Sequence, residues 1–523
     1  MIQPSEHSQP PSQIKLIFRN VSAHYLVTGT ELLIGLFMLP FNVAHLGQTT
    51  YGLWVMVASI TIYFSVLDMG FGVAQVKFAA QYKAQGDSKA LNEIASTMFC
   101  IFLAVGLFTY AVAILLSLNL EHLFHVTPQQ ATTGRSILLM ISAYVALGFP
   151  FSVFGGIVNG FQRMYLNGIV AMVTTLLVAG ANVVVLKAGY GLVELVAVTT
   201  TLRMLSYFAY ALNAYRVFPA LRIRLSHFSW NRLREVTGFS VFMLLIDLAN
   251  KLNYSTDTLV IGIFLTTGAV AVWAVAQRLI EIVQRINTQL NGVLFPAVVE
   301  SSTTQHLDKL QKILLQGTRL SLAMGIPMST GLALLASPVV TAWVGPDFAG
   351  SVPVIYILCI SVVFRVGNAT SAIVLEGSGQ HRLLAISNIA MAVGNLVLST
   401  LLVRQFGLVG VAAGTLIAVG LISILVIFPA ACRRVNVGRV YVLRQSVWPA
   451  MWPAIVMAGF LLVTRNVFQP NWFYLLYWFY LLLLVVSAGI IYVSLFLRVA
   501  INDSEREWYL AIVRRVTRLK TQE

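Results

Sequence analysis

The chain has 523 residues, of which 58% are hydrophobic and only 10% are charged, and its mean hydropathy is +0.82. Soluble domains carry about 25% charged residues, so this composition excludes an ordinary soluble protein. The formal net charge of +15 would suit a nucleic-acid binder, but the basic residues lie in short loops between long apolar runs rather than on one continuous patch.

Apolar runs of about 20 residues recur from end to end, and each is long enough to cross a hydrocarbon core of about 30 Å as a helix. Residues 1–20 are polar and proline-rich, so we expect the first apolar run to be an uncleaved anchor. We predict about fourteen spans, centred near residues 32, 60, 104, 145, 176, 203, 250, 282, 325, 364, 393, 418, 456 and 485.

The basic residues are distributed unequally between the two sides of the membrane. With a cytoplasmic N-terminus, one set of loops is rich in Lys and Arg, whereas the opposite loops hold only Arg135, Lys187, Arg404 and Arg465. The positive-inside rule then places both termini in the cytoplasm. The basic charge is an orientation signal and a contact for anionic membrane lipid, so no nucleic-acid partner is expected.

Three short motifs recur at nearly constant separations. YGLW is echoed by VAVW, IVNGFQR by IVLEGSGQHR, and YGLVELVA by FGLVGVAA, at separations of 219, 217 and 216 residues (54 to 273, 160 to 377 and 191 to 407). Each match falls at the same place in a block of six spans. Because six is even, the two blocks run in the same direction through the membrane, as in transporters built from parallel repeats.

These observations predict an all-α polytopic membrane protein with two parallel six-helix lobes and two extra C-terminal helices; that the lobes surround a central cavity is implied by the family resemblance described next. The expected segments are a cytoplasmic tail (1–20), an N-lobe (21–218), a basic cytoplasmic linker (219–235), a C-lobe (236–431), a basic cytoplasmic loop (432–446), the two extra spans (447–498) and a basic amphipathic tail (499–523).

The motifs LGQTTYGLW, LDMGFGVA and GDSKALNEIAST occur in this order between residues 46 and 97. The series resembles the N-terminal signature of the polysaccharide transporter family, which includes the O-antigen and exopolysaccharide flippases. That family shares a superfamily with the multidrug and toxin extrusion transporters and the lipid II flippase.

The resemblance implies a flippase in the bacterial inner membrane, with a cavity lined mainly by spans 1, 2, 7 and 8. Its substrate would be an undecaprenyl-pyrophosphate-linked oligosaccharide, moved from the cytoplasmic to the outer leaflet by alternating access. The last two spans would form a groove for the lipid tail. The protein is expected to be a monomer that contacts membrane lipid, with polysaccharide polymerase and chain-length proteins as further partners.

Charged residues inside the apolar runs are the candidate substrate-binding groups, because an intramembrane charge is costly and is by default functional. Span 7, LLIDLANKLNYSTDTLVIGIF, carries Asp247, Lys251 and Asp257 on one broad helical face. Span 8 carries Arg278, Glu281 and Arg285 at i, i+3 and i+7. The remaining deep charges are Glu31, Asp68, Arg203 and Arg365.

A second interpretation of these charges stays open. Buried charges also pair to hold helices in register, and Asp247 with Lys251, or Glu281 with either neighbouring arginine, has suitable spacing. The acidic and basic members of the deep set balance, so their number alone does not indicate a cationic cavity.

No cofactor is expected, because the chain lacks the GxxxxGK[ST] loop of an ATP-driven pump. EHLFH at 121–125 holds two histidines without further ligands, so no metal site is predicted.

The driving ion would be H⁺ or Na⁺. By analogy alone, Asp247 or Asp257 with Asn388 and Asn395 would form a cation site.

Two other functions compete with a flippase. One is a drug or organic-cation antiporter of the related extrusion family, against which stand the fourteen spans and the deep arginines. The other is an integral-membrane glycosyltransferase or polymerase, which would place an acidic pair in an outer loop, whereas the first outer loop, AHLGQTTYG, has no carboxylate. We therefore expect a transporter rather than an enzyme.

Overall fold

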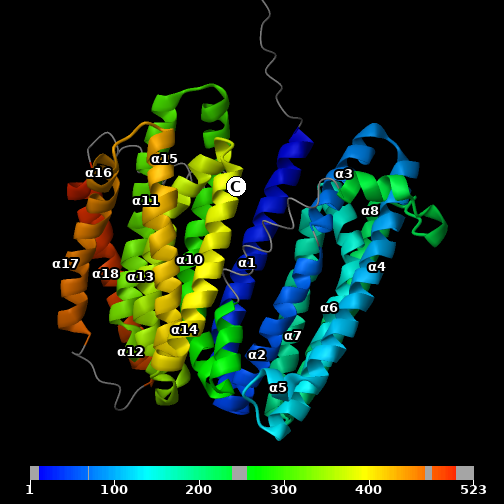
Figure 1. The fold of residues 1–523 in the computed structure, drawn as a ribbon, viewed down its shortest axis with the longest axis horizontal. Coiled ribbons are helices and arrows are strands. Elements are labelled where there is room, and N and C mark those ends of the chain that lie inside the picture. Colours follow the sequence, from blue (N-terminus) through cyan, green and yellow to red (C-terminus); the bar gives the residue numbers. More distant parts are fainter. Residues whose placement is uncertain (1–10, 69, 238–255, 466–473, 502–523) are drawn as a thin grey trace, which may run out of the picture. The chain divides into compact units, whose positions relative to one another are not determined.

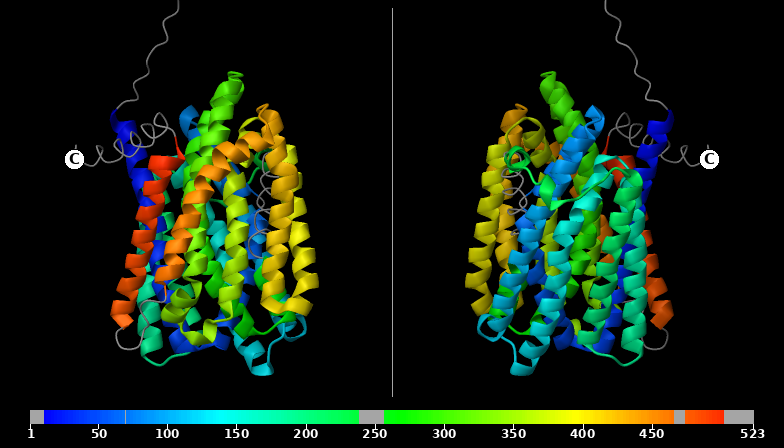
Figure 2. Two further views of the ribbon diagram at one scale, coloured as in Figure 1. Left: turned by 90° about the vertical axis from the view of Figure 1, so that its left-hand side faces the viewer. Right: turned by 90° about the vertical axis from the view of Figure 1, so that its right-hand side faces the viewer.

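The computed structural model describes residues 11–68, 70–237, 256–465 and 474–501 (Figure 1). Within this part of the chain, ten helices are long and apolar enough to cross a membrane, or up to 11 if the bent pair α11 (Leu307–Leu334) and α12 (Ala336–Val344) is one span. The expected all-α, many-span membrane fold is confirmed (Figure 2). The predicted centre at residue 250 lies outside the described residues, and every other predicted centre falls inside a helix.

The first six predicted spans correspond to a continuous series of helices. They are α1 (Pro11–Leu46), α2 (Gln48–Phe64), α3 (Phe71–Gln85), α4 (Ser88–Leu118), α6 (Pro128–Gly160), α7 (Met164–Lys187) and α8 (Leu192–Val217), with the short α5 (Leu120–Leu123) after α4. The α-helix of the second span ends at Phe64, and α3 starts after Gly70, whose φ of 73° only glycine adopts without steric cost.

The second half begins with a helical stretch over residues 256–264. It continues through α10 (Thr267–Thr303), α11 (Leu307–Leu334), α12 (Ala336–Val344), α13 (Ser351–Gly377), α14 (His381–Ile422), α15 (Phe428–Arg434), α16 (Arg439–Val442), α17 (Trp448–Thr464) and α18 (Tyr474–Leu495). The long α14 holds two predicted spans, which meet at the non-helical Gly407 (φ 57°, ψ −134°).

The two halves share one packing feature that agrees with the predicted repeat. Gly160 ends α6, where an added Cβ would lie 2.7 Å from the Cβ of Ala79 in α3. Gly377 ends α13, where an added Cβ would lie 2.6 Å from Cγ1 of Val298 in α10. The two pairs are separated by 217 and 219 residues (160 to 377 and 79 to 298), so the same helix crossing occurs once in each half.

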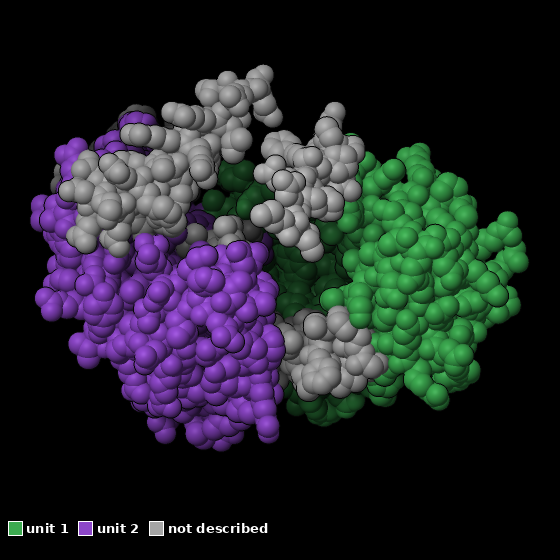
Figure 3. Space-filling view, turned by 90° about the horizontal axis from the view of Figure 1, so that it is seen from above, with its two compact units in different colours: residues 1–271 green, residues 272–523 purple. Residues whose placement is uncertain are grey.

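The chain divides into two compact units, Met1–Ala271 and Val272–Glu523, which Figure 3 colours separately. The division lies inside α10, after the predicted lobe boundary at 219–235. Contacts made by residues close to the start of α10 explain the difference. The Gln48 side chain donates to the carbonyl of Gly268 (3.3 Å), and Nδ1 of His125 lies 2.7 Å from the carbonyl oxygen of Ile263. These contacts attach the start of α10 and the segment before it to the first unit.

Each unit has its own apolar core. In the first unit, Met98 and Phe102 of α4 are fully buried against Val153 and Ile157 of α6. In the second unit, α17 and α18 pack on α11 through a cluster that includes Leu322, Met457 and Tyr492. The two extra spans are therefore integral to the second unit.

Candidate functional site

α10 is 37 residues long and carries a charged face in the part that belongs to the second unit; it is not one of the ten helices that length and apolar composition alone mark as membrane spans. Arg278 Nη1 lies 3.2 Å from Glu281 Oε2, and the two side chains are 22% and 36% exposed. Arg285 is half-buried one further turn along the helix and is the middle residue of α10, which runs from 267 to 303. The predicted Arg278–Glu281 pair thus exists, and it places a paired guanidinium and a second arginine on one side of a membrane-length helix.

Span 7 is described only in part, and Asp247 and Lys251 lie outside the described residues. Asp257 is buried, with 7% of its surface exposed. Its neighbour Thr256 has Oγ1 3.0 Å from the hydroxyl of Tyr63 in α2, and Tyr63 interacts electrostatically with Asp257. The structure therefore brings Asp257 to a polar cluster with α2 in the first unit.

Glu31 and Arg203 lie on exposed positions of α1 and α8 in the first unit. The Arg203 guanidinium is 6.0 Å from the ring centroid of Tyr144 in α6, and Glu31 interacts electrostatically with Tyr210 of α8. Tyr207, one turn before Tyr210, stacks on Tyr144 at 5.4 Å with an interplanar angle of 1°. Sequence reasoning missed these tyrosines, although the i, i+3 spacing of Tyr207 and Tyr210 beside Arg203 was a usable signal.

Asp68 and Arg365 are placed differently from the other candidates. Asp68 Oδ2 accepts a hydrogen bond of 3.2 Å from the backbone amide of Gly72, so the carboxylate satisfies a free N–H at the start of α3. This is a helix-capping contact, and a role in binding substrate remains a prediction. Arg365 is half-buried on α13 in the second unit.

A buried polar cluster occupies α14 on both sides of its kink. Asn395 Oδ1 accepts hydrogen bonds from Ser399 Oγ (2.9 Å) and Thr415 Oγ1 (3.2 Å). Both hydroxyls also contact the carbonyl of Val411. Asn388 is half-buried about two turns before Asn395, on the same side of the kink in α14. These amides belong to the second unit and Asp257 to the first, so the cation site suggested by analogy stays a prediction.

The second unit also holds a buried arginine that the sequence analysis did not select. Arg319 is 4% exposed in α11, and its Nε donates to the carbonyl of Gln445 (2.8 Å) in the π-helical turn Leu443–Val447. Ser446 Oγ donates to the carbonyl of Leu315 (2.8 Å) beside it. Arg319 therefore fixes the start of α17 to α11, and its signal was a charge inside the otherwise apolar run RLSLAMGIP.

The predicted basic linker, residues 219–235, lies in the described part of the chain; with the next two residues it forms the segment that we call the strap (residues 219–237). Side chains from the first turns of α4 bind its backbone. The Asn92 amide donates to the carbonyl of Ala220 (3.0 Å) and accepts from the amide of Arg222 (2.7 Å). Thr97 Oγ1 accepts from the amide of Ser229 (3.1 Å). Backbone groups that would otherwise need water are therefore satisfied by the first unit.

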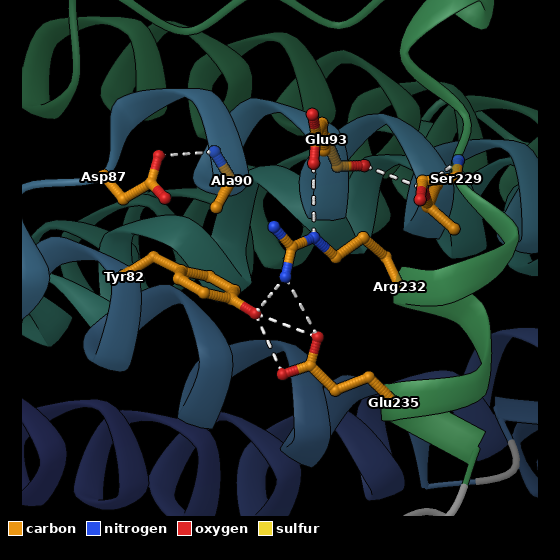
Figure 4. A network of polar contacts seen from close by, with 8 residues as sticks. Tyr82, Asp87, Ala90, Glu93, Ser229, Arg232 and Glu235 are labelled. Carbon is orange, nitrogen blue, oxygen red and sulfur yellow. Dashed lines mark hydrogen bonds and ion pairs between the residues drawn. The ribbon is translucent and has the colours of Figure 1, made fainter.

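Arg232 joins the strap to α3 and α4 (Figure 4). Its guanidinium lies 3.3 Å from Glu93, 3.2 Å from Glu235 and 2.7 Å from the hydroxyl of Tyr82, which itself donates to Glu235 at 2.9 Å. Partial burial, together with the hydrogen bond to Glu235, raises the pKa of Tyr82, which lies beyond the apolar span Gln48–Asp68, to about 12. The phenol therefore stays protonated and donating at physiological pH.

Comparison with known proteins gives the family. A family model described as "Polysaccharide biosynthesis protein" matches residues 17–302, which is more than half of the chain. The chain belongs to this family. The resemblance drawn from the motifs between residues 46 and 97 is thereby confirmed.

Three known proteins illustrate the relationship. The probable flippase AglR of Haloferax volcanii is 26% identical over 223 residues, covering 42% of this chain and 44% of AglR, so the match spans less than half of that relative. The succinoglycan biosynthesis transport protein ExoT of Rhizobium meliloti is 22% identical over 381 residues, 72% of each chain. A structure of the lipid II flippase MurJ in an inward closed conformation has a TM-score of 0.67 at 14% identity and covers 91% of this chain and 98% of its own. The last comparison shows a shared fold.

Proposed function

We propose that this protein is a flippase that moves undecaprenyl-pyrophosphate-linked oligosaccharides from the cytoplasmic to the outer leaflet of a bacterial inner membrane. The product would feed surface polysaccharide synthesis, as O-antigen, capsule or exopolysaccharide, in company with a polymerase and chain-length proteins. Family membership supports transport for polysaccharide biosynthesis. The names of AglR and ExoT point in the same direction.

The charged face of α10 is the observation that carries the proposal. A pyrophosphate and its sugars cross the hydrocarbon only if polar groups replace water along the route. Arg278 and Arg285 lie two turns apart on a helix of membrane length, and a guanidinium binds phosphate oxygens through paired hydrogen bonds. Glu281 pairs with Arg278, and it would release Arg278 to the phosphate.

The other charged residues would contribute to the same transport cycle. Lys251 would assist the arginines with the phosphates, while Asp247, Asp257, Glu31, Asp68, Arg203 and Arg365 would contact sugar hydroxyls or couple an ion, H⁺ or Na⁺, to movement. Asp257 and Glu31 each lie beside a tyrosine, and tyrosines offer both a hydroxyl and an apolar ring to a sugar.

The decisive experiment is a deletion strain assayed for surface polysaccharide and for lipid-linked oligosaccharide in the cytoplasmic leaflet. We expect surface polysaccharide to disappear and the lipid-linked intermediate to accumulate, because synthesis continues while transport stops. A strain with normal surface polysaccharide and new sensitivity to organic cations would contradict the proposal and favour the drug antiporter.

The proposed direction of transport requires cytoplasmic termini, which reporter fusions can test. Fusions after Arg224 and Arg439 should report a cytoplasmic position, because the basic loops are retained on that side. Fusions near Pro128 and Pro346 should report the outer side. A cytoplasmic signal from the Pro346 fusion would invert the predicted topology of the second half.

A further inference from the structure

The outward side of the strap combines exposed apolar and basic side chains. Leu225 and Trp230 are each 74% exposed, and Arg222, Arg224 and Arg234 are exposed beside them. The Trp230 ring rests edge-on against Phe228, with centroids 5.3 Å apart. Large apolar side chains this exposed, alternating with arginines, indicate a surface that contacts something other than water alone.

The arginines of the strap region are divided between two tasks. Residues 216–237 contain five arginines and a single acidic residue, Glu235. The side chains of Arg232 and Glu235 contact each other, Tyr82 and Glu93 in the internal network. The exposed charged side chains of residues 219–237 are therefore all basic, and the backbone there is held by side chains of α4, to which Arg232 adds its own contacts with α3 and α4.

Chain continuity places this surface at the edge of a membrane. The strap follows directly on the apolar span Leu192–Val217. Asn92 and Thr97, whose side chains hydrogen-bond its backbone, lie within the first three turns of α4, which begins at Ser88. At this depth tryptophan prefers the interface between headgroups and acyl chains, while arginine binds anionic headgroups.

We propose that the outward face of the strap binds anionic phospholipid headgroups, with Trp230 and Leu225 inserted into the interfacial layer and Arg222, Arg224 and Arg234 on the phosphates. Because the strap is fixed to α3 and α4, the bound lipid anchors the first unit at a defined depth in the leaflet. This anchoring does not depend on which cargo is transported.

The test uses purified full-length protein in detergent, titrated with phosphatidylglycerol or phosphatidylcholine while its thermal unfolding midpoint is followed. A lipid that binds the folded state raises the midpoint. The variant Arg222→Gln/Arg224→Gln/Arg234→Gln is compared with Arg382→Gln/Arg433→Gln/Arg439→Gln, which removes three exposed arginines from the second unit.

We expect the strap variant to need at least about tenfold more phosphatidylglycerol for half of the shift, since each arginine near an anionic surface contributes roughly fivefold. The control variant should change this concentration less than about threefold. Equal effects of the two variants, or equal shifts with phosphatidylcholine, would overturn the proposal, because either result indicates a non-specific response.

A second readout tests insertion. In vesicles containing brominated phosphatidylglycerol, the intact protein should lose more tryptophan fluorescence than Trp230→Phe, because bromine quenches only at contact. Identical quenching in both proteins would place Trp230 in water, would refute lipid binding by the strap and would favour a soluble protein partner at this surface.

Discussion

Cells that carry Arg285→Ala are expected to lose surface polysaccharide while the amount of membrane-inserted protein stays normal. Arg285 is the middle residue of α10, where the headgroup must pass under the proposed function. A hydrogen bond to a charged group in a partly dehydrated site contributes about 1.5 to 3 kcal/mol, so losing it weakens pyrophosphate binding roughly ten- to hundredfold. Surface polysaccharide on intact cells and protein in isolated membranes are the two measurements.

Two further variants separate the chemistry from general damage. Arg285→Lys should retain partial function, because it keeps the charge and loses the paired hydrogen-bond geometry. Arg278→Ala should reduce surface polysaccharide less than Arg285→Ala, since the Arg278 guanidinium already forms an ion pair with Glu281. Normal surface polysaccharide in Arg285→Ala cells would show that Arg285 is not the pyrophosphate ligand.

Gly52→Ala should prevent stable folding of the first unit. A Cβ at residue 52 would lie 1.7 Å from the carbonyl oxygen of Thr267 and 2.6 Å from its carbon. Both are backbone atoms, so no side-chain rotation relieves the clash and α2 must move away from the start of α10. Overpacking of this kind costs about 3 kcal/mol or more. The expected result is little monodisperse protein after detergent extraction and a strongly lowered unfolding midpoint.

Gly180→Ala provides the matched control within the same unit. Gly180 lies inside α7, and an added Cβ there meets nothing within 4 Å. Replacing this glycine should leave the midpoint unchanged or raise it slightly, because alanine favours a helix by up to about 1 kcal/mol. If Gly52→Ala unfolds at the same temperature as Gly180→Ala, the close approach at Gly52 is absent.

The helical framework was predictable because two strong signals specify it. Hydropathy locates spans wherever an apolar run reaches membrane thickness, and the centres at 104 and 456 fall inside α4 and α17 for this reason. The repeat could be recognised in the sequence because close helix packing requires glycine at equivalent positions, as at Gly160 and Gly377. The boundary between the two compact units could not be predicted from the sequence, because it depends on contacts such as that between Gln48 and Gly268, which are 220 positions apart.

The sequence indicated which residues to consider for the candidate site, but it indicated few of the contacts that these residues make. Helical spacing correctly indicated the pair Arg278–Glu281. Counting charges did not indicate that the Asp68 carboxylate accepts from the amide of Gly72, a local contact, and the role of Asp68 in binding substrate stays a prediction. Arg319 was overlooked although its charge stands out in an apolar run, and its contact with the backbone carbonyl of Gln445 is one that no sequence pattern marks.

The fastening of the strap has a consequence for the order in which the protein is built. Of the side chains that hold it, Tyr82, Asn92, Glu93 and Thr97 all precede it in the chain, and Glu235 lies within it. Membrane proteins are made from the N-terminus, and early segments fold while later ones are still being translated. Every contact that holds the strap can therefore form once residue 235 is available, before most of the second unit has been translated.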